Sequence, residues 1–298
     1  MVYIKSTNYY MDCFGEESKL PDQLKKIIFK VKALTGRFFV KKTQNGEIIL
    51  LPDKNKRIKK NLEKFLKIYG IKTVCISKDL EEDKFFEEFD LNILNGKWLY
   101  KYLIFNYIKY ISKEQEKRLQ EIEVSFLVNQ ITELDLENIE EISKDVKIVN
   151  VITNSSSRIK RLAEKLYSEN GIVINTIKNH KKSLIKSNII INIDFSEEEL
   201  NKYLIPRKAI IINIGPKTKV KNKGFSGINI WDYNTSIPKK YLDNDLNTKT
   251  FRKEVLYESY IYKNTSPRNI FKEIKKDNIY VESLVGQKGI IRKAEFSK

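Results

Sequence analysis

The stretch from Ile122 to Gly215 contains five short runs rich in β-branched residues: VSFLV (residues 124–128), KIVNVI (147–152), IVINT (172–176), NIIINI (188–193) and KAIIINI (208–214). Polar or helix-forming segments separate each run from the next. Strands that alternate with helices in this way are typical of a parallel sheet with helices packed on it. The stretch therefore predicts an α/β domain of nucleotide-binding type.

Helix signals fall in the segments between these runs. Ile159, Leu162 and Leu166 recur at the spacing of one helix face, which is the pattern of a helix packed on a sheet. Ser196 and Glu199 form the sequence pattern of a capping box, and this pattern predicts the start of a shorter helix. Both helices lie where a parallel sheet needs crossover connections.

The chain divides into three expected parts, with a Rossmann-like sheet domain in the middle. Residues 1–112 form a smaller α+β domain, in which Gln44-Asn45-Gly46 signals a β-hairpin. Residues 113–235 form the Rossmann-like domain, with a sixth strand at Gly227–Trp231 and a polar loop after it. Residues 236–298 form a helical C-terminal segment, and packing back on the N-terminal domain is one arrangement open to it.

Another distinctive segment is Trp98–Ile111, which is dense in aromatic residues and poor in polar ones. As a single helix it would be about 20 Å long, too short to cross a membrane. A helix that is apolar on most sides is usually buried. We therefore expect this aromatic helix near Trp98 to lie between the domains or at a homodimer interface, and we expect no membrane association.

The composition suits a cytoplasmic protein. The chain has 298 residues, a formal net charge of +17 and two cysteines, Cys13 and Cys75. Two isolated cysteines and the single His180 do not supply the spacing of a metal site, so none is expected. The net charge has two interpretations. It can attract nucleic acid or another anionic partner, or it can reflect codon bias toward lysine, asparagine and isoleucine. We favour the second.

In a doubly wound sheet, ligands bind beyond the carboxyl ends of the strands, where the strand order reverses. This rule selects the polar residues and the glycine that directly follow the expected strands. Each of them also has a structural alternative, such as capping a helix or closing a loop. The candidate cofactor-binding residues are Asn129, Thr153, Asn154, Ser155, Ser156, Arg158, Asp194 and Gly215.

The loop after the second strand carries a family resemblance. Asn154, Ser156 and Arg158, followed by Leu162-Ala163, resemble the NADP-binding domains of the shikimate dehydrogenase and glutamyl-tRNA reductase group, if one residue is deleted. In that group the second strand commonly ends in Asn-Arg-Thr/Ser. The resemblance covers roughly residues 122 to 232. It implies a loop that faces the ribose or 2′-phosphate of a dinucleotide, with NADP or NAD as the cofactor.

The sequence departs from this family at the residues that matter for function. The arginine expected directly after Asn154 is Ser155, so Arg158 or Arg161 would have to replace it. The first turn, Asn129-Gln130-Ile131-Thr132, has no glycine, although a pyrophosphate needs close backbone approach there. The family's catalytic signatures are missing as well, and no catalytic residue can be assigned.

Three functions follow from these observations. The first is a degenerate Rossmann-like protein that is non-catalytic or binds a nucleotide or dinucleotide in an altered mode. The second is an NAD(P)-dependent oxidoreductase with non-standard catalytic residues. The third is a basic protein that binds nucleic acid or another anionic partner. The missing glycines and catalysts favour the first, in which the ligand would be a dinucleotide or another small phosphorylated compound.

Overall fold

The computed structural model forms two compact units. Unit 1 comprises Met1–Trp98 and Ile237–Asn278, and unit 2 comprises Leu99–Ser236 and Ile279–Lys298. The chain thus passes from unit 1 to unit 2, returns to unit 1 and ends in unit 2. Residues 236–298 were expected to form one C-terminal segment, but the two units share them. The structure describes residues 1–14, 18–43, 46–81, 84–86, 88–154, 156–177, 184–242, 246, 248–266 and 269–296.

Unit 2 is a Rossmann-like α/β domain. Its sheet has the strand order β8-β7-β6-β9-β10-β11-β12-β13. The strands from β6 to β11 pair in parallel, and numbered along the chain they follow the order 3-2-1-4-5-6 of a dinucleotide-binding sheet. The strands are β6 (Glu123–Leu127), β7 (Ile148–Ile152), β8 (Ile174–Ile177), β9 (Ile189–Asn192), β10 (Ile210–Asn213) and β11 (Ile228–Ser236).

The five predicted strands between Ile122 and Gly215 are therefore confirmed in type and order. The central strands β9 and β10 both read Ile-Ile-Ile-Asn and are fully buried, as expected for a parallel sheet covered on both faces. The helices in this stretch are α5 (Glu133–Ser143), α6 (Ser156–Asn170) and α7 (Glu197–Leu200). The capping box of Ser196 and Glu199 is present at the start of α7.

The polar loop expected after Trp231 is instead the second half of β11. Tyr233 and Thr235 are buried, and this part of the strand pairs antiparallel with β12 (Tyr280–Gly286), which pairs in turn with β13 (Gly289–Ile290). Asn234 and Ser236, which alternate with them, are half-buried. The alternation of buried and half-buried residues is that of a strand, although its polar composition suggested a loop.

The aromatic segment near Trp98 forms two helices, α3 (Lys97–Tyr102) and α4 (Ile104–Glu114), rather than one. Most of their apolar side chains are buried, and Trp98, Tyr102 and Tyr110 are half-buried. Tyr100 stacks on Tyr233 of β11, with ring centroids 4.6 Å apart. The structure thus leaves mainly polar residues of this segment for an intermolecular contact. Within the described residues, no helix is both long enough and apolar enough to cross a membrane.

Unit 1 contains a five-stranded sheet with the order β2-β3-β1-β4-β5. The expected hairpin is present, because β2 and β3 pair antiparallel, although Gln44 and Asn45 themselves lie outside the described residues. The pairings of β1 with β3 and β4, and of β4 with β5, are parallel. The strands are β1 (Val2–Ser6), β2 (Phe39–Thr43), β3 (Gly46–Leu51), β4 (Thr73–Ile76) and β5 (Asn92–Leu94).

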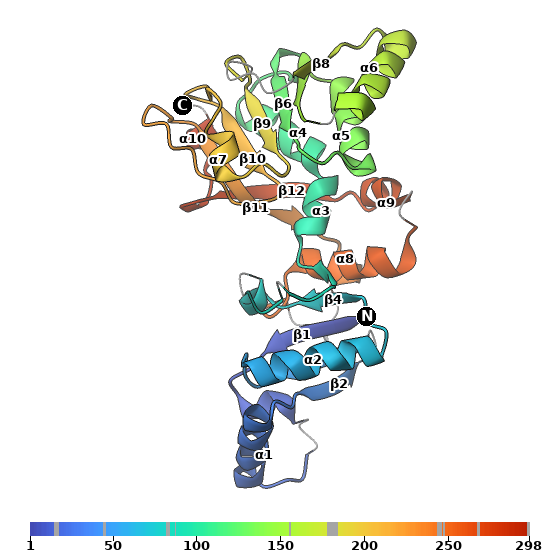
Figure 1. Ribbon diagram of the computed structural model, residues 1–298, viewed down its shortest axis with the longest axis vertical. Helices are drawn as coiled ribbons and strands as arrows, with labels where there is room; N and C mark the ends of the chain where they lie inside the picture. Colours follow the sequence, from blue (N-terminus) through green and yellow to red (C-terminus); the bar gives the residue numbers. More distant parts are fainter. Residues whose placement is uncertain are drawn as a thin grey trace. The chain divides into compact units, whose positions relative to one another are not determined.

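Helices cover both faces of this sheet (Figure 1). On one face, α2 (Lys56–Ile68) buries Ile58, Leu62 and Leu66 against the sheet. On the other face, α8 (Lys253–Asn264) and α1 (Asp22–Thr35) pack against side chains such as Tyr3 of β1. Because side chains alternate along a strand, Tyr3 and Ile4 belong to different cores.

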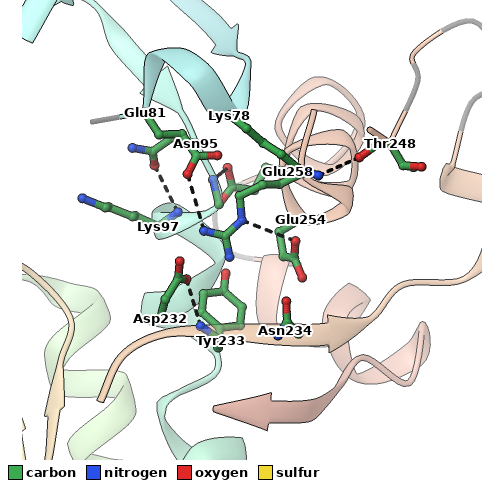
Figure 2. Close-up of polar contacts among 12 residues, drawn as sticks. Lys78, Glu81, Asn95, Lys97, Asp232, Tyr233, Asn234, Thr248, Glu254 and Glu258 are labelled. Atoms are coloured by element: carbon green, nitrogen blue, oxygen red, sulfur yellow. Dashed lines mark hydrogen bonds and ion pairs between the residues drawn. The ribbon is translucent and has the colours of Figure 1, made fainter. Parts of the chain in front are cut away.

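Ile237–Asn278, the segment that returns to unit 1, makes polar contacts with the rest of that unit. Lys78 Nζ donates a hydrogen bond to the Thr248 carbonyl at 2.8 Å (Figure 2). The buried carboxylate of Glu258 in α8 accepts one from the backbone N–H of Gly96 at 2.8 Å. The short helix α9 (Ile270–Lys276) follows α8.

Candidate functional site

The turn after β6 lies at the switch point of the unit 2 sheet, where β6 neighbours β9 although β7 and β8 intervene in the sequence. Asp194, two residues past the end of β9, projects onto this turn. Its two carboxylate oxygens accept hydrogen bonds from consecutive backbone N–H groups, those of Asn129 at 2.6 Å and Gln130 at 2.8 Å. An anionic group that belongs to the chain therefore occupies the donors of this turn.

The next donors along the chain are also used internally. Thr132 is the N-cap of α5, and its hydroxyl accepts a hydrogen bond from the backbone N–H of Asp135 at 3.3 Å. The Asp135 carboxylate returns the contact by accepting from the backbone N–H of Thr132 at 2.8 Å. A helix N-terminus binds anions through such free N–H groups. At α5, the capping box satisfies part of this capacity.

Asn129 links three loops at the carboxyl edge of the sheet. Its side-chain amide donates to Glu199 Oε1 of α7 at 3.2 Å, and its carbonyl oxygen accepts from Asn154 Nδ2, after β7, at 3.1 Å. Hydrogen bonds from the Ser196 backbone, then from the Ser196 and Asn129 side chains, lower the pKa of Glu199. The structure therefore brings Asn129, Asn154 and Asp194 together, as the strand-end rule predicted.

Arg158 also reaches this edge, but it is turned toward protein atoms. Its Nη1 donates to the carbonyl of Ile131 at 3.1 Å and lies 3.4 Å from Glu133 Oε1. The side chain is half exposed, so the ion pair itself contributes little to stability. The guanidinium that was expected to face a 2′-phosphate thus bridges α6 to the turn after β6.

The other candidate cofactor-binding residues differ in burial and in whether the structure describes them. Thr153 is buried. Ser156 is the first residue of α6, although the structure does not describe its side chain. Ser155 lies outside the described residues, as does His180. Gly215 is required by packing, because a Cβ at this position would lie 2.3 Å from the Ile193 carbonyl oxygen. The loop after β10 therefore presses against the backbone that precedes Asp194.

A buried amide network at the same edge was not predicted. Asn192 ends β9, and its Nδ2 donates to Asn213 Oδ1 at the end of β10 at 3.2 Å. Asn213 Nδ2 donates in turn to Asn229 Oδ1 of β11 at 2.6 Å. The Thr218 hydroxyl also donates to Asn213. The repeated Ile-Ile-Ile-Asn ending of the two strands was the available signal, since both asparagines follow buried runs.

A cavity of about 470 Å³ lies at the opposite, amino edge of the unit 2 sheet. Its lining includes Lys117, Lys186 and Lys208, whose ammonium groups have no hydrogen-bond or ion-pair partner among the described residues, and one acidic residue, Glu295. Gln115 also lines it, and the buried Gln115 Oε1 has no hydrogen-bond partner in the described part of the chain. This cavity is distinct from the switch point.

Neither cysteine is placed for nucleophilic chemistry. Burial, more than the nearby Glu258 charge, raises the pKa of the Cys75 thiol, which is completely inaccessible. Burial and the neighbouring Asp12 raise the pKa of Cys13 to about 12. Reactive cysteines have lowered pKa values. Across the residues that the structure describes, no group of three or more His, Cys, Asp or Glu side chains could hold a metal ion.

Unit 1 also contains a buried ionic cluster. Arg252 Nε lies 3.6 Å from Glu254 Oε2, and Arg252 Nη1 lies 3.7 Å from Glu81 Oε2. The side chain of Glu254 is almost inaccessible and the Glu81 side chain is largely buried. Buried charges need such pairing. These ion pairs therefore give Arg252, Glu254 and Glu81 a structural role.

Comparison with known proteins finds only distant structural likenesses. No protein-family model and no characterised protein matches the sequence. Among solved structures, L-tryptophan dehydrogenase from Nostoc punctiforme is 14% identical, with 92% of this chain and 77% of that chain covered and a TM-score of 0.34. Shikimate 5-dehydrogenase from Listeria monocytogenes, solved with shikimate and NAD, is 10% identical over 92% and 95% of the two chains, with a TM-score of 0.30.

A third similar structure is the catalytic subunit of aspartate transcarbamoylase from M. jannaschii, 12% identical over 93% of this chain and 86% of that one, with a TM-score of 0.29. At these TM-scores the likenesses carry no argument about fold or activity. The strand order of unit 2 carries the fold assignment instead. The chain is an α/β protein with a Rossmann-like domain.

Proposed function

We propose that this chain is a degenerate Rossmann-like protein whose dinucleotide position is closed by its own carboxylate, and that it acts as a non-catalytic scaffold. One observation carries the proposal: Asp194 accepts hydrogen bonds from both Asn129 N–H and Gln130 N–H. In dinucleotide-binding sheets the pyrophosphate lies at the corresponding turn and helix N-terminus. Here a side chain takes the role of that anion.

A pyrophosphate would meet two obstacles at this turn. It would approach the fixed negative charge of Asp194, and like charges at hydrogen-bonding distance repel. It would also meet the Cβ atoms of Asn129 and Gln130, where a glycine would allow close backbone approach. Binding would require Asp194 to leave its two donors. The polar contacts of Asn129 with Asn154 and Glu199 hold the surrounding loops as they are.

The competing function, an NAD(P)-dependent oxidoreductase, needs the same crevice open. Its cofactor would be NADP or NAD, and Arg158 would have to leave Ile131 to reach a 2′-phosphate. The described residues at the switch point include no reactive thiol, no histidine and no group of side chains that could hold a metal ion. These observations favour the non-catalytic scaffold over the oxidoreductase. For either function, the cytoplasm is the compartment that we propose.

A binding experiment with a matched variant tests the proposal. Isothermal titration with NAD, NADP and inorganic pyrophosphate should give no heat of binding with the wild-type protein. Asp194→Ala frees the two N–H groups and should gain weak pyrophosphate binding, whereas Glu198→Ala, a control in the exposed first turn of α7, should not. Saturable binding of NADP to the wild type, with a thermal stabilisation of about 2.7 kcal/mol at ~100 times its Kd, would overturn the proposal.

The amino-edge cavity supports a second candidate, binding of a small phosphorylated ligand in an altered position. Its volume of about 470 Å³ is that of a small-molecule site, and Lys117, Lys186 and Lys208 outnumber the single acid Glu295. Titration with ATP should then give binding that Lys208→Ala weakens and that Lys160→Ala, on an exposed position of α6, leaves unchanged. Equal binding by both variants, or binding only to nucleic acid, would exclude this candidate.

A further inference from the structure

Helix α1 of unit 1 presents an apolar stripe to solvent. Leu20, just before the helix, and Leu24, Ile27, Val31 and Leu34 within it are exposed by 41%, 46%, 56%, 50% and 71% respectively. Their spacing along the chain is four, three, four and three residues. This is the spacing of the a and d positions in a coiled coil. Apolar residues scattered singly over a surface are ordinary, but a contiguous stripe marks an interaction site.

The opposite face of α1 is the one that packs inside unit 1. Ile28 and Phe29 contact the core formed with Phe39 and other buried side chains, and Phe29 stacks on Phe39. The helix ends at Gly36 in a left-handed conformation, and Arg57 Nη1 donates to the Leu34 carbonyl at 3.1 Å. The helix is therefore already ordered in one copy of the chain, and a partner need not supply that ordering energy.

The charged side chains of α1 lie mostly away from the apolar stripe. Lys25 is buried and lies 3.7 Å from Asp22. Lys32 Nζ lies 3.9 Å from the centre of the Phe39 ring, and Lys26 Nζ lies 5.4 Å from that of Tyr10. Lys30 is the one lysine in a position that flanks the seam. In a pair of α1 helices it would face Thr35 if they are parallel or Gln23 if they are antiparallel.

We propose that α1 pairs with α1 of a second copy of this chain, about a two-fold axis that passes near Ile27. The stripe is self-complementary, because its spacing repeats on the partner and no like charges meet across the seam. Ile27 is its midpoint, so the two Ile27 side chains meet in either helix direction. An isologous contact of this kind closes a dimer.

The size of the stripe sets the strength of the dimer. Helix α1 has 14 residues and is about 21 Å long. Covering the five apolar side chains on both copies would bury on the order of 900 Å² of apolar surface, which is below the range of ~1,200–2,000 Å² for standard interfaces. We therefore expect a reversible dimer with a Kd on the order of 10 µM.

Sedimentation equilibrium of the full chain tests the pairing. Between about 1 and 200 µM, a range that brackets this Kd, the apparent mass should rise from 35.2 kDa toward twice that value. Ile27→Glu should hold the protein at 35.2 kDa at every concentration. Ile68→Glu changes an isoleucine on the neighbouring helix α2 that is even more exposed than Ile27, and it should leave the rise unchanged. A rise that survives Ile27→Glu places the contact elsewhere and overturns the proposal.

A cross-link locates the contact directly. Ile27→Cys, in a Cys13→Ser background, should form a disulfide-linked dimer under mild oxidation, whereas Ile68→Cys in the same background should not. Wild-type protein that stays at 35.2 kDa up to about 200 µM overturns the proposal. So does a monomer that co-sediments with vesicles of anionic lipid, because the stripe would then fit a membrane surface as a basic amphipathic helix does.

Discussion

Asp194 and Asn129, 65 positions apart in the sequence, are joined by a hydrogen bond of 2.6 Å from the Asn129 backbone N–H to the Asp194 carboxylate. The second carboxylate oxygen accepts from Gln130 N–H at 2.8 Å. This contact ties the turn after β6 to the turn after β9 at the point where strand order reverses. Under the proposed function this contact explains why the turn needs no glycine, because no external anion would then have to approach its backbone.

Replacing the acceptor tests the structural value of this contact. Asp194→Asn keeps the shape but turns an N–H₂ group toward one of the two backbone donors. We expect the free energy of unfolding of unit 2 to fall by about 1–3 kcal/mol, the cost of an unsatisfied polar group. Urea denaturation followed by Trp231 fluorescence, in a Trp98→Phe background, measures it. Glu198→Gln should change the value by less than ~0.5 kcal/mol, and an Asp194→Asn protein as stable as its parent would contradict the interpretation.

Gly215 offers a test of the packing behind Asp194. In Gly215→Ala the new Cβ would meet the Ile193 carbonyl oxygen at 2.3 Å, so the backbone after β9 or β10 must move. We expect a loss of about 1–3 kcal/mol from overpacking, measured by the same urea denaturation. Gly224→Ala is the control, because its Cβ would lie at ordinary contact distance, 3.5 Å from its neighbours. Equal stability of the two variants would refute the steric argument.

The sequence was sufficient for the elements whose signals are local. The β-branched runs from Val124 to Ile214, the apolar face of α6 and the capping box at Ser196 each depend on residues close together in the chain. The carboxyl-end rule then placed Asn129, Asn154 and Asp194 at one edge, because parallel strands end on the same side of a sheet. Their proximity was predictable even though their partners were not.

The remainder depends on contacts that sequence spacing does not encode. Whether Asp194 binds a ligand or the backbone of Asn129 is decided by loops far apart in the chain. The second half of β11 was expected to be a loop, since Asn234 and Ser236 are polar, yet pairing with β12 makes it a strand. Helix α1 gave no single core face, because its apolar residues lie on both its buried and its exposed sides.

The buried amide network makes a further prediction. Asn213 is 2% exposed, accepts from Asn192 and donates to Asn229 and to the Ile230 carbonyl. Asn213→Ala leaves these partners buried without their hydrogen bonds, and we expect a loss of about 2–4 kcal/mol from unit 2. Asn170→Ala, at the exposed end of α6, should cost less than ~1 kcal/mol. Hydrogen exchange should also speed up at β9 and β10, and unchanged exchange there would argue against the network.

The thiols should be unreactive in the folded protein. Burial and Asp12 raise the pKa of Cys13 to about 12 from an ordinary value of 9.0, so its thiolate population at pH 8 falls by a factor of about a thousand. Cys75 is inaccessible. Labelling with iodoacetamide should therefore proceed at both sites only after unfolding. Rapid native labelling of Cys75, read by mass spectrometry, would contradict its burial.

Asp277 should make the free energy of unfolding of unit 1 depend on pH in the acid range. Its carboxylate accepts hydrogen bonds from Tyr241 Oη at 2.6 Å, Lys240 Nζ at 3.0 Å and Tyr257 Oη at 3.0 Å. Desolvation opposes ionisation, but these three contacts outweigh it and lower the pKa of Asp277. A carboxylate with a lowered folded-state pKa stabilises the protein above its ordinary pKa, near ~3.9, and this stability is lost as the pH falls through the lower folded-state value.

We therefore expect Asp277→Asn to reduce the stability of unit 1 by about 1–3 kcal/mol at pH 7, since the amide cannot accept all three bonds. The difference from wild type should shrink as the pH falls from ~4 toward the lower folded-state pKa of Asp277, because the unfolded chain then takes up a proton that the folded carboxylate binds only at a lower pH. Urea denaturation from pH 7 down to pH 3, read by hydrogen exchange in β1 and β4, measures both effects. Asp90→Asn is the control, because Asp90 is exposed and should give a curve parallel to wild type. If the Asp277→Asn difference stays constant with pH, the lost stability comes from packing rather than from the charge of Asp277.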